Sequence, residues 1–105
     1  MTKYSYLFWT SANLDEAKKI AHLLLSKKLI GCASIIPHVI SLFEWKGKIE
    51  EANEVKVILK TKKEHYSAIR SCIEENASYE VPEIILIEWD AANQPYLDWI
   101  SETTK

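Results

Sequence analysis

Glycine and proline are scarce in this chain of 105 residues, which contains two glycines and three prolines. Such a composition leaves little room for flexible linkers or low-complexity segments, so we expect one domain spanning residues 1–105. Two glycines cannot form a glycine-rich phosphate cradle, and the sequence has no Walker, GxGxxG, GxSxG or HExxH motif. These absences predict a protein that is not an enzyme and has no organic cofactor.

The sequence also lacks a basic block and a long apolar run. Thirteen Lys and Arg residues against fifteen Asp and Glu residues give a formal charge of −2, which argues against nucleic acid as a partner. No stretch of about 18 apolar residues is present to span a bilayer, and the first residues resemble a strand more than a secretion signal. We therefore expect a cytoplasmic protein that binds neither nucleic acid nor membrane, with Cys32 and Cys72 as free thiols.

Hydrophobic periodicity predicts the element order β-α-β-β-α-β, followed by a short C-terminal helix. Strands are expected over residues 4–11, 33–45 and 83–89, and the alternating Val55, Val57 and Leu59 mark one more. Residues 4–11 are aromatic and apolar, which is typical of a strand covered on both faces, and residues 83–89 carry apolar side chains on both sides. The order is that of a ferredoxin-like α+β sandwich, an antiparallel four-stranded sheet backed by two helices.

Cap and turn signals place the helix ends. Asn13 followed by Glu16 resembles a capping box, and Thr61 followed by Glu64 resembles a second one at the next helix. Gly31 is expected to end the first helix in a left-handed turn.

The second strand and its partner form a hairpin that is too long for the domain. About fifteen residues at roughly 3.3 Å each span about 50 Å, whereas a compact domain of this size is only about 35 Å across. Phe43 and Trp45 fall on one face of the ribbon, and Ile40 and Leu42 fall on the other. Apolar residues on both faces of a projecting ribbon need a partner, and the simplest partner is another copy of the chain. We expect these four residues at that interface.

The possible soft metal ligands are scattered one per element, and none has closed-site spacing such as CxxC or HxxxH. Cys32, at the mouth of the long strand, is either a small buried residue or a thiolate ligand for Cu(I), Zn(II) or Hg(II). Cys72 is expected in the core, and His22 and His65 are expected on solvated surfaces. His38 follows a proline at an expected β-bulge.

An acidic cluster and a set of aromatic residues leave further alternatives open. Glu50, Glu51 and Glu54, near the expected hairpin tip, are either a solvated turn or a hard-cation site. The four tryptophans are expected in the core or at an interface.

The block CASIIPHVISLFEWKGKIEEANEVKVILKTK, residues 32–62, resembles the central block of the CutA, or divalent-cation tolerance, proteins. The shared marks are Cys32, Ile35-Ile36-Pro37, Phe43-Glu44-Trp45-Lys46-Gly47, Glu54 and Lys60-Thr61, and downstream Tyr79-Glu80-Val81-Pro82-Glu83 and Tyr96-Leu97-Asp98-Trp99. The resemblance covers essentially the whole chain. Two departures are Ala77-Ser78, where family members commonly carry His-Pro, and Ala33-Ser34, where a small residue and Asn are usual.

The resemblance implies a homotrimer of ferredoxin-like subunits, similar to the PII signalling proteins, whose long hairpins pair across subunits. It also implies binding of copper or another divalent cation and a role in metal tolerance. Cys32 is then the main metal ligand, supplemented by a carboxylate such as Glu83, while the absence of His at Ala77 weakens binding.

Two other functions remain open from the sequence. The first is a PII-like sensor that holds a small anionic or nucleotide-like ligand in a cleft between subunits, lined by Trp45, Lys60, Tyr79 and Glu83. The second is a structural scaffold whose trimer presents loops to another protein.

Overall fold

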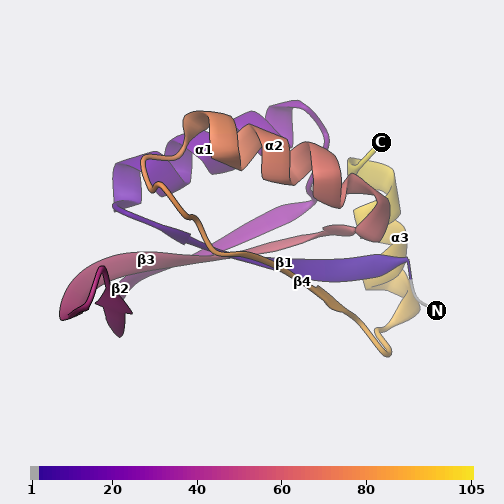
Figure 1. Ribbon diagram of the computed structural model, residues 1–105. Helices are drawn as coiled ribbons and strands as arrows, with labels where there is room; N and C mark the ends of the chain where they lie inside the picture. Colours follow the sequence, from indigo (N-terminus) through magenta and orange to yellow (C-terminus); the bar gives the residue numbers. More distant parts are fainter. Residues whose placement is uncertain (1–2) are drawn as a thin grey trace.

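A four-stranded antiparallel sheet, covered on one face by two helices, forms the body of the protein in a computed structural model that describes residues 3–105 (Figure 1). The strands lie in the order β2-β3-β1-β4. The elements are β1 (Tyr4–Ser11), α1 (Leu14–Ser26), β2 (Cys32–Trp45), β3 (Lys48–Lys62), the 3₁₀ turn η1 (Lys63–His65), α2 (Tyr66–Asn76), β4 (Ile84–Glu88) and α3 (Gln94–Thr103). The predicted ferredoxin-like α+β sandwich is confirmed.

The core lies between the sheet and the helices α1 and α2. Strand β1 alternates strictly, with every second side chain fully buried, as expected when one face of a strand packs on helices. The alternation predicted for β3 is confirmed, since its three apolar positions are buried. The core is built from Leu7 and Trp9 of β1, Ala17, Ile20 and Leu24 of α1, Val55, Val57 and Leu59 of β3, and Ile69, Cys72 and Ile73 of α2.

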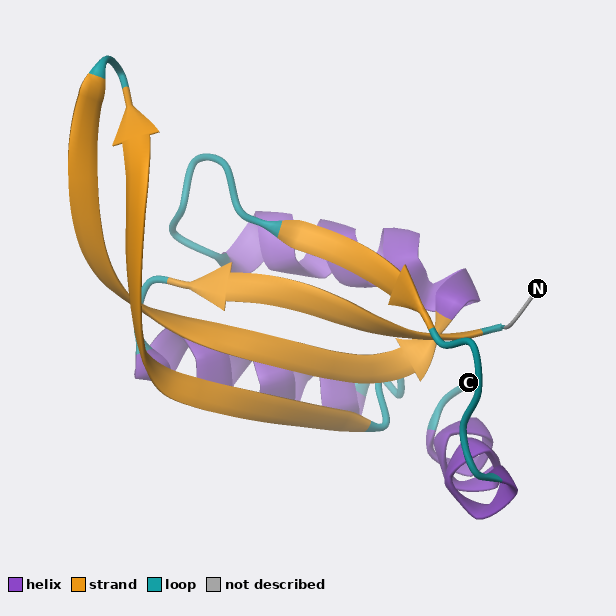
Figure 2. Ribbon diagram, turned by 90° about the horizontal axis from the view of Figure 1, so that it is seen from below, coloured by secondary structure: helices purple, strands orange, loops and turns teal. Residues whose placement is uncertain are grey.

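The opposite face of the sheet is only partly covered within one chain (Figure 2). Phe8 pairs with Ile58 of β3 and with Ile85 of β4, so the three side chains form one row across this face. Ile85 and Ile87 are exposed, and α3 lies at one end of the sheet. The expectation that β1 is covered on both faces is thus only partly met within a single chain, because the side chains on its second face are half-buried.

The β2–β3 hairpin projects beyond the sheet, as predicted (Figure 2). Its strands pair from Cys32–Lys60 to Trp45–Lys48, and the register shifts between Ile36 and Val39, which confirms a bulge at His38. The molecule measures 45 × 27 × 23 Å. Lys46 and Gly47 both have positive φ, 52° and 83°, as the tight two-residue turn of a hairpin requires.

The capping box at Asn13 is confirmed, because the Asn13 side chain accepts a hydrogen bond from the Glu16 amide at 2.8 Å. The second predicted box is wrong. Thr61 stays in β3, where its hydroxyl donates to the Leu29 carbonyl at 2.5 Å, and η1 begins without a side-chain cap. The Thr61 hydroxyl therefore bonds to a residue 32 positions earlier in the chain and not to the first turn of the helix that follows it.

Gly31 does not form the predicted left-handed turn. Helix α1 ends at Ser26, and Lys28 takes the left-handed conformation with φ 58°. Gly31 is required for a different reason, because a Cβ atom at this position would lie 2.7 Å from Ile100 Cδ1 in α3. The absence of a side chain lets α3 pack against the start of β2.

Candidate functional site

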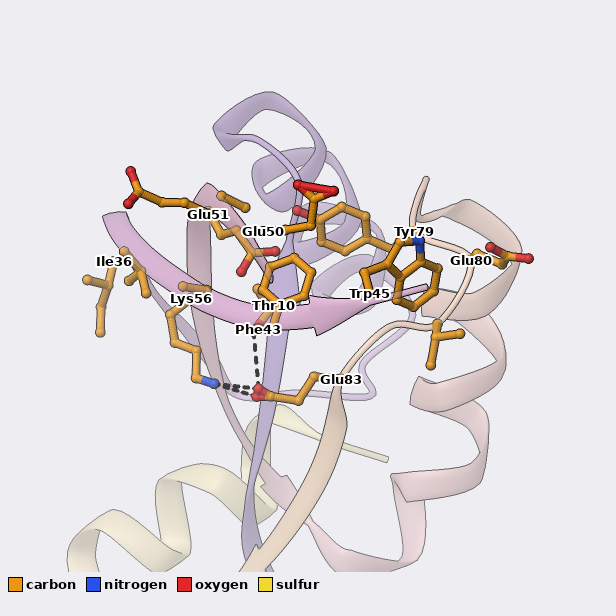
Figure 3. Close-up of a pocket in the computed structure, with 15 residues that line it drawn as sticks. Thr10, Ile36, Phe43, Trp45, Glu50, Glu51, Lys56, Tyr79, Glu80 and Glu83 are labelled. Carbon is orange, nitrogen blue, oxygen red and sulfur yellow. Dashed lines mark hydrogen bonds and ion pairs between the residues drawn. The ribbon is translucent and has the colours of Figure 1, made fainter. Parts of the chain in front are cut away.

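A cleft of about 810 Å³ lies where the hairpin leaves the sheet (Figure 3). Strand β2 contributes Phe43 and Trp45 to its lining, and the segment between α2 and β4 contributes Tyr79 and Glu83. The volume falls within the range of small-molecule sites, roughly 300–1,000 Å³.

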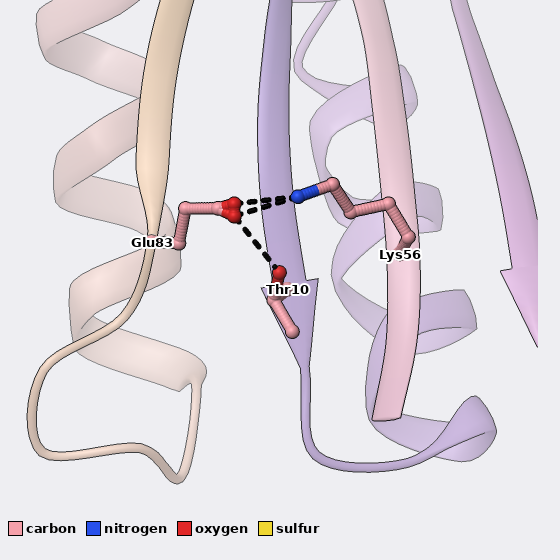
Figure 4. Close-up of polar contacts among 3 residues, drawn as sticks. All are labelled: Thr10, Lys56 and Glu83. Carbon is pink, nitrogen blue, oxygen red and sulfur yellow. Dashed lines mark hydrogen bonds and ion pairs between the residues drawn. The ribbon is translucent and has the colours of Figure 1, made fainter. Parts of the chain in front are cut away.

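An ion pair ties the β4 side of the cleft to the sheet (Figure 4). Lys56 Nζ of β3 donates to both carboxylate oxygens of Glu83, at 2.6 and 2.5 Å, and Thr10 Oγ1 of β1 donates to the same carboxylate at 3.2 Å. Glu83 therefore links three strands. Both charged side chains are partly exposed, so the pair contributes modestly to stability, and its main effect is to fix the Glu83 carboxylate in place.

Glu54 is a buried carboxylate on the wall of the cleft, with only 7% of the residue exposed. It accepts a hydrogen bond from Tyr79. Burial, followed by the hydrogen bond to Glu54 and the negative charges of Glu54 and Glu16, raises the pKa of Tyr79 to about 12. Tyr79 thus remains a protonated hydrogen-bond donor throughout the physiological pH range.

Glu16 holds the segment that carries Tyr79. Its carboxylate accepts hydrogen bonds from the Ser78 amide at 2.8 Å, from the Ser11 hydroxyl at 2.8 Å and from the Ala12 amide at 3.3 Å. Burial alone would raise the pKa of Glu16, but the hydrogen bonds from Ser78, Ser11 and Ala12 outweigh it and lower the pKa. One side chain at the start of α1 thereby positions the residue next to Tyr79.

Cys32 lies away from the cleft, at the first residue of β2, and is partly exposed. It pairs with Lys60, whose ammonium group lies 3.5 Å from Cys32 Sγ and 2.6 Å from Ser34 Oγ. The cleft begins four residues further along β2, at Ile36, which is about 13 Å at the usual rise per residue. Lys60 therefore does not line this cleft, and Lys56 is the lysine that does.

The model of the CutA1 divalent ion tolerance protein family matches residues 5–103. The chain belongs to the CutA family. It is 38% identical to the divalent-cation tolerance protein CutA of Archaeoglobus fulgidus over 102 residues, covering 97% of this chain and 99% of that protein. It is also 38% identical to mouse Protein CutA over 101 residues, 96% of this chain, but spans only 57% of the length of that protein.

Solved structures of CutA proteins superpose closely on the fold described above. The periplasmic divalent cation tolerance protein CutA from Archaeoglobus fulgidus is 37% identical with a TM-score of 0.94, covering 97% of this chain and 99% of that one. CutA1 from Oryza sativa is 30% identical with a TM-score of 0.94, covering 99% and 96% respectively. The names of the family and of the Archaeoglobus fulgidus relative describe tolerance of divalent ions and no enzymatic activity. No helix among residues 3–105 is long and apolar enough to cross a membrane.

The ligands that the CutA resemblance implies do not meet within one subunit. Among residues 3–105 there is no group of three His, Cys, Asp or Glu residues that could hold a metal ion. Cys32 lies beside the Lys60 ammonium group, and Glu83 is paired with Lys56. Residues 3–105 of a single chain therefore do not form a closed metal site.

The other candidate metal ligands, Cys72 and the three histidines, are either buried within the fold or exposed at the surface. Cys72 is buried in the core, and His22 and His38 are exposed. The expectation that His65 is exposed is wrong. The η1 turn buries its ring, and Nε2 lies 3.0 Å from the Lys105 carbonyl oxygen.

Sequence reasoning placed Trp45, Lys60, Tyr79 and Glu83 in a cleft between subunits. Within one chain, Trp45, Tyr79 and Glu83 line the cleft found here, and Lys60 does not. It missed Lys56, Thr10 and Glu16. The acidic cluster also pointed to this region, but Glu54 was expected near the hairpin tip, whereas it lies where the hairpin joins the sheet. Whether the cleft holds a ligand stays a prediction.

Proposed function

We propose that this chain acts as a homotrimer in the response to divalent cations and catalyses no reaction. The observation that carries the proposal is the hairpin, whose outer face is unpartnered. Ile40 and Leu42 are each 69% exposed, and Ile49 is 84% exposed. A closed ring of three copies would cover this face and pair the free sheet edges β2 and β4. Membership of the CutA divalent ion tolerance family supports the cellular role.

Copper is the metal that we propose, with Cys32 as the main ligand and a carboxylate such as Glu83 as a supplement. A thiolate prefers Cu(I) or Hg(II) to Mg(II) or Ca(II). Because Glu83 is already paired with Lys56, it would have to leave that ion pair in order to bind metal. Binding is therefore expected to be weak to moderate and not to control folding.

Calorimetric titration with copper under reducing conditions tests the metal assignment. Cys32→Ser should lose most copper binding while the assembly stays intact, because the thiolate is the only soft ligand at that position. Cys72→Ser is the matched control, since this thiol is buried in the core and should contribute nothing. Unchanged copper affinity in Cys32→Ser would overturn the assignment.

A second proposed function is a PII-like sensor that holds a small molecule in the cleft. The observation in its favour is the cleft itself, which combines the aromatic Trp45 and Tyr79 with the fixed Glu83 carboxylate. A thermal-shift screen of small metabolites tests it, and a ligand that stabilises the protein should lose its effect when Trp45 is replaced by Leu.

The cytoplasm is the compartment that we propose. Relatives differ in this respect, since the Archaeoglobus fulgidus protein is described as periplasmic and an Arabidopsis thaliana protein as chloroplastic. Fractionation of the native host with antibody detection would test the location, and recovery in an exported fraction would refute it.

A further inference from the structure

The cleft carries an excess of negative charge. Among residues 3–105, Lys56 is the only basic residue in its lining, and this lysine is paired with Glu83. Within the same described part of the chain, four carboxylates of the lining have no lysine or arginine partner, and they come from β3 and from the segment after α2: Glu50, Glu51, Glu54 and Glu80. A cleft lined by charges of one sign concentrates ligands of the opposite sign. This charge disfavours the anionic or nucleotide-like ligand that the sequence left open.

The walls between these carboxylates are apolar and aromatic. Phe43, Trp45 and Val81 line the cleft with exposed side chains, together with Ile36 and Val39. Such walls offer a bare metal ion no ligands, and the acidic residues are not grouped in threes as a metal site needs. The surface suits a ligand that has an apolar part as well as a positive charge.

Aromatic rings in this protein already contact ammonium groups. Lys46 Nζ lies 5.7 Å from the centroid of the Trp45 ring, and Lys56 Nζ lies 5.5 Å from that of Phe8. Both distances are within the range of a cation–π interaction. The Trp45 ring is thus placed to attract a cation at the edge of the cleft.

Glu54 supplies the anchor for the charged group. It is buried on the cleft wall, and the Tyr79 hydroxyl occupies one of the roughly four acceptor positions of a carboxylate. A charge-assisted hydrogen bond to a buried carboxylate is stronger than one made at the surface. The exposed Glu50 and Glu80 would add a weaker, screened attraction at the rim.

We propose that this cleft binds a small organic cation, an alkylammonium or guanidinium group on an apolar stem, with its charge at Glu54 and its stem against Phe43 and Trp45. The inference rests on the sensor function proposed above, because it names the ligand class of that cleft. Its anchor, Glu54, is not among the ligands proposed for the metal, Cys32 and Glu83, and Cys32 lies about 13 Å from the start of the cleft along β2.

Calorimetry with agmatine, which carries a guanidinium and an ammonium group on a butyl stem, tests the proposal on the assembled protein. Citrate is the anionic comparison and Mg²⁺ the comparison without an apolar part, all at one ionic strength. Agmatine should bind saturably, whereas citrate should give no saturable heat and Mg²⁺ should not displace agmatine.

Two variants locate the site. Glu54→Gln keeps the acceptor for Tyr79 and removes the charge, and it should weaken agmatine binding about tenfold, the usual effect of losing one charged hydrogen bond. Glu50 is exposed, so Glu50→Gln carries little risk to folding. This variant should weaken agmatine binding about threefold, as expected for the loss of a screened charge. Glu102→Gln, exposed on α3 outside the cleft, is the control and should bind as wild type.

The proposal is overturned if citrate binds as well as agmatine, if both cleft variants bind agmatine like wild type, or if agmatine does not bind at all. Sedimentation and copper titration of the same sample separate this result from the function proposed above. Intact assembly and copper binding without agmatine binding would refute the ligand class alone. Agmatine binding to a chain that neither assembles nor binds copper would refute the trimeric metal role alone.

Discussion

Glu16 shows how one side chain can decide the geometry of a site that it does not line. It accepts the Ser78 amide across 62 positions of sequence and so fixes the approach to Tyr79. Position 78 is one where the family resemblance places proline in many members, and a proline has no N–H to donate. The Glu16–Ser78 contact is therefore available to this chain because it carries serine at that position.

Replacing Glu16 with Gln should destabilise the protein at neutral pH by about 1 kcal/mol, which is below the roughly 1.5–3 kcal/mol of hydrogen bonds to a charged group because the site is partly exposed. The pKa of Glu16 is lowered in the folded protein from its ordinary value of 4.5. Its stabilising effect is thus present above pH 4.5 and is lost as the pH falls through the folded-state pKa. Urea unfolding of wild type and Glu16→Gln at pH 7 and pH 3 measures this, and the difference should shrink at pH 3. An equal difference at both pH values, or one also seen in Glu102→Gln, would contradict it.

At the scale of elements, periodicity predicted the strands and helices because burial on one face dominates their formation. Val55, Val57 and Leu59 are buried as their alternation indicates, and the short C-terminal helix expected from the sequence is α3, with Pro95 in its first turn. Two of the predicted cap signals failed because the residue makes a contact with a distant part of the chain instead. The Thr61 hydroxyl donates to the Leu29 carbonyl, and Gly31 lies against α3. Local sequence does not contain such contacts.

The same limit applies to the cleft. Trp45, Tyr79 and Glu83 were predictable through the resemblance, since they belong to its motifs. Lys56 was not, because its meeting with Glu83 depends on three strands lying in one register, and that register shifts at the bulge after Ile36. Lys60, four residues further along β3 on the same face, lies instead beside Cys32.

The two glycines should respond differently to alanine. In Gly31→Ala the new Cβ would lie 2.7 Å from Ile100 Cδ1 and 2.9 Å from Thr103 Oγ1, so these two side chains of α3, or the helix that carries them, must shift, at a cost of about 1–3 kcal/mol. In Gly47→Ala the Cβ meets nothing within 4 Å, and the cost is the positive φ of 83°, about 1–2 kcal/mol.

Hydrogen exchange separates these two effects. Amides of α3 should exchange faster in Gly31→Ala than in Gly47→Ala or wild type, whereas Gly47→Ala should affect only the hairpin. Equal α3 exchange in both variants would show that Gly31 does not position this helix.

At the scale of the whole molecule, a single chain leaves apolar surface in three places. These are the outer face of the hairpin, the open face of the sheet around Ile85 and Ile87, and the cleft. A domain of this size buries only about two-thirds of the surface of its unfolded chain, so it gains much from covering the rest. Two free sheet edges, β2 and β4, allow head-to-tail contacts that close into a ring. The cleft differs from the other two surfaces because its carboxylates would resist burial against an apolar neighbour.

A charge placed on the outer face of the hairpin tests whether this face is covered by another copy of the chain. Leu42→Asp should convert the 36 kDa trimer expected from three 12.1 kDa chains into monomers, because a buried unpaired carboxylate costs several kcal/mol at each of three interfaces. Ser67→Asp, which adds the same charge on the exposed side of α2, should remain trimeric. Analytical ultracentrifugation at micromolar concentration distinguishes the two.

Linking folding to assembly should also give wild type a melting temperature above the 45–65 °C typical of small mesophilic domains. This temperature should rise with protein concentration, and Leu42→Asp should lose both properties. A monomeric wild type, or a trimeric Leu42→Asp with unchanged melting, would mean that the hairpin is not the assembly surface.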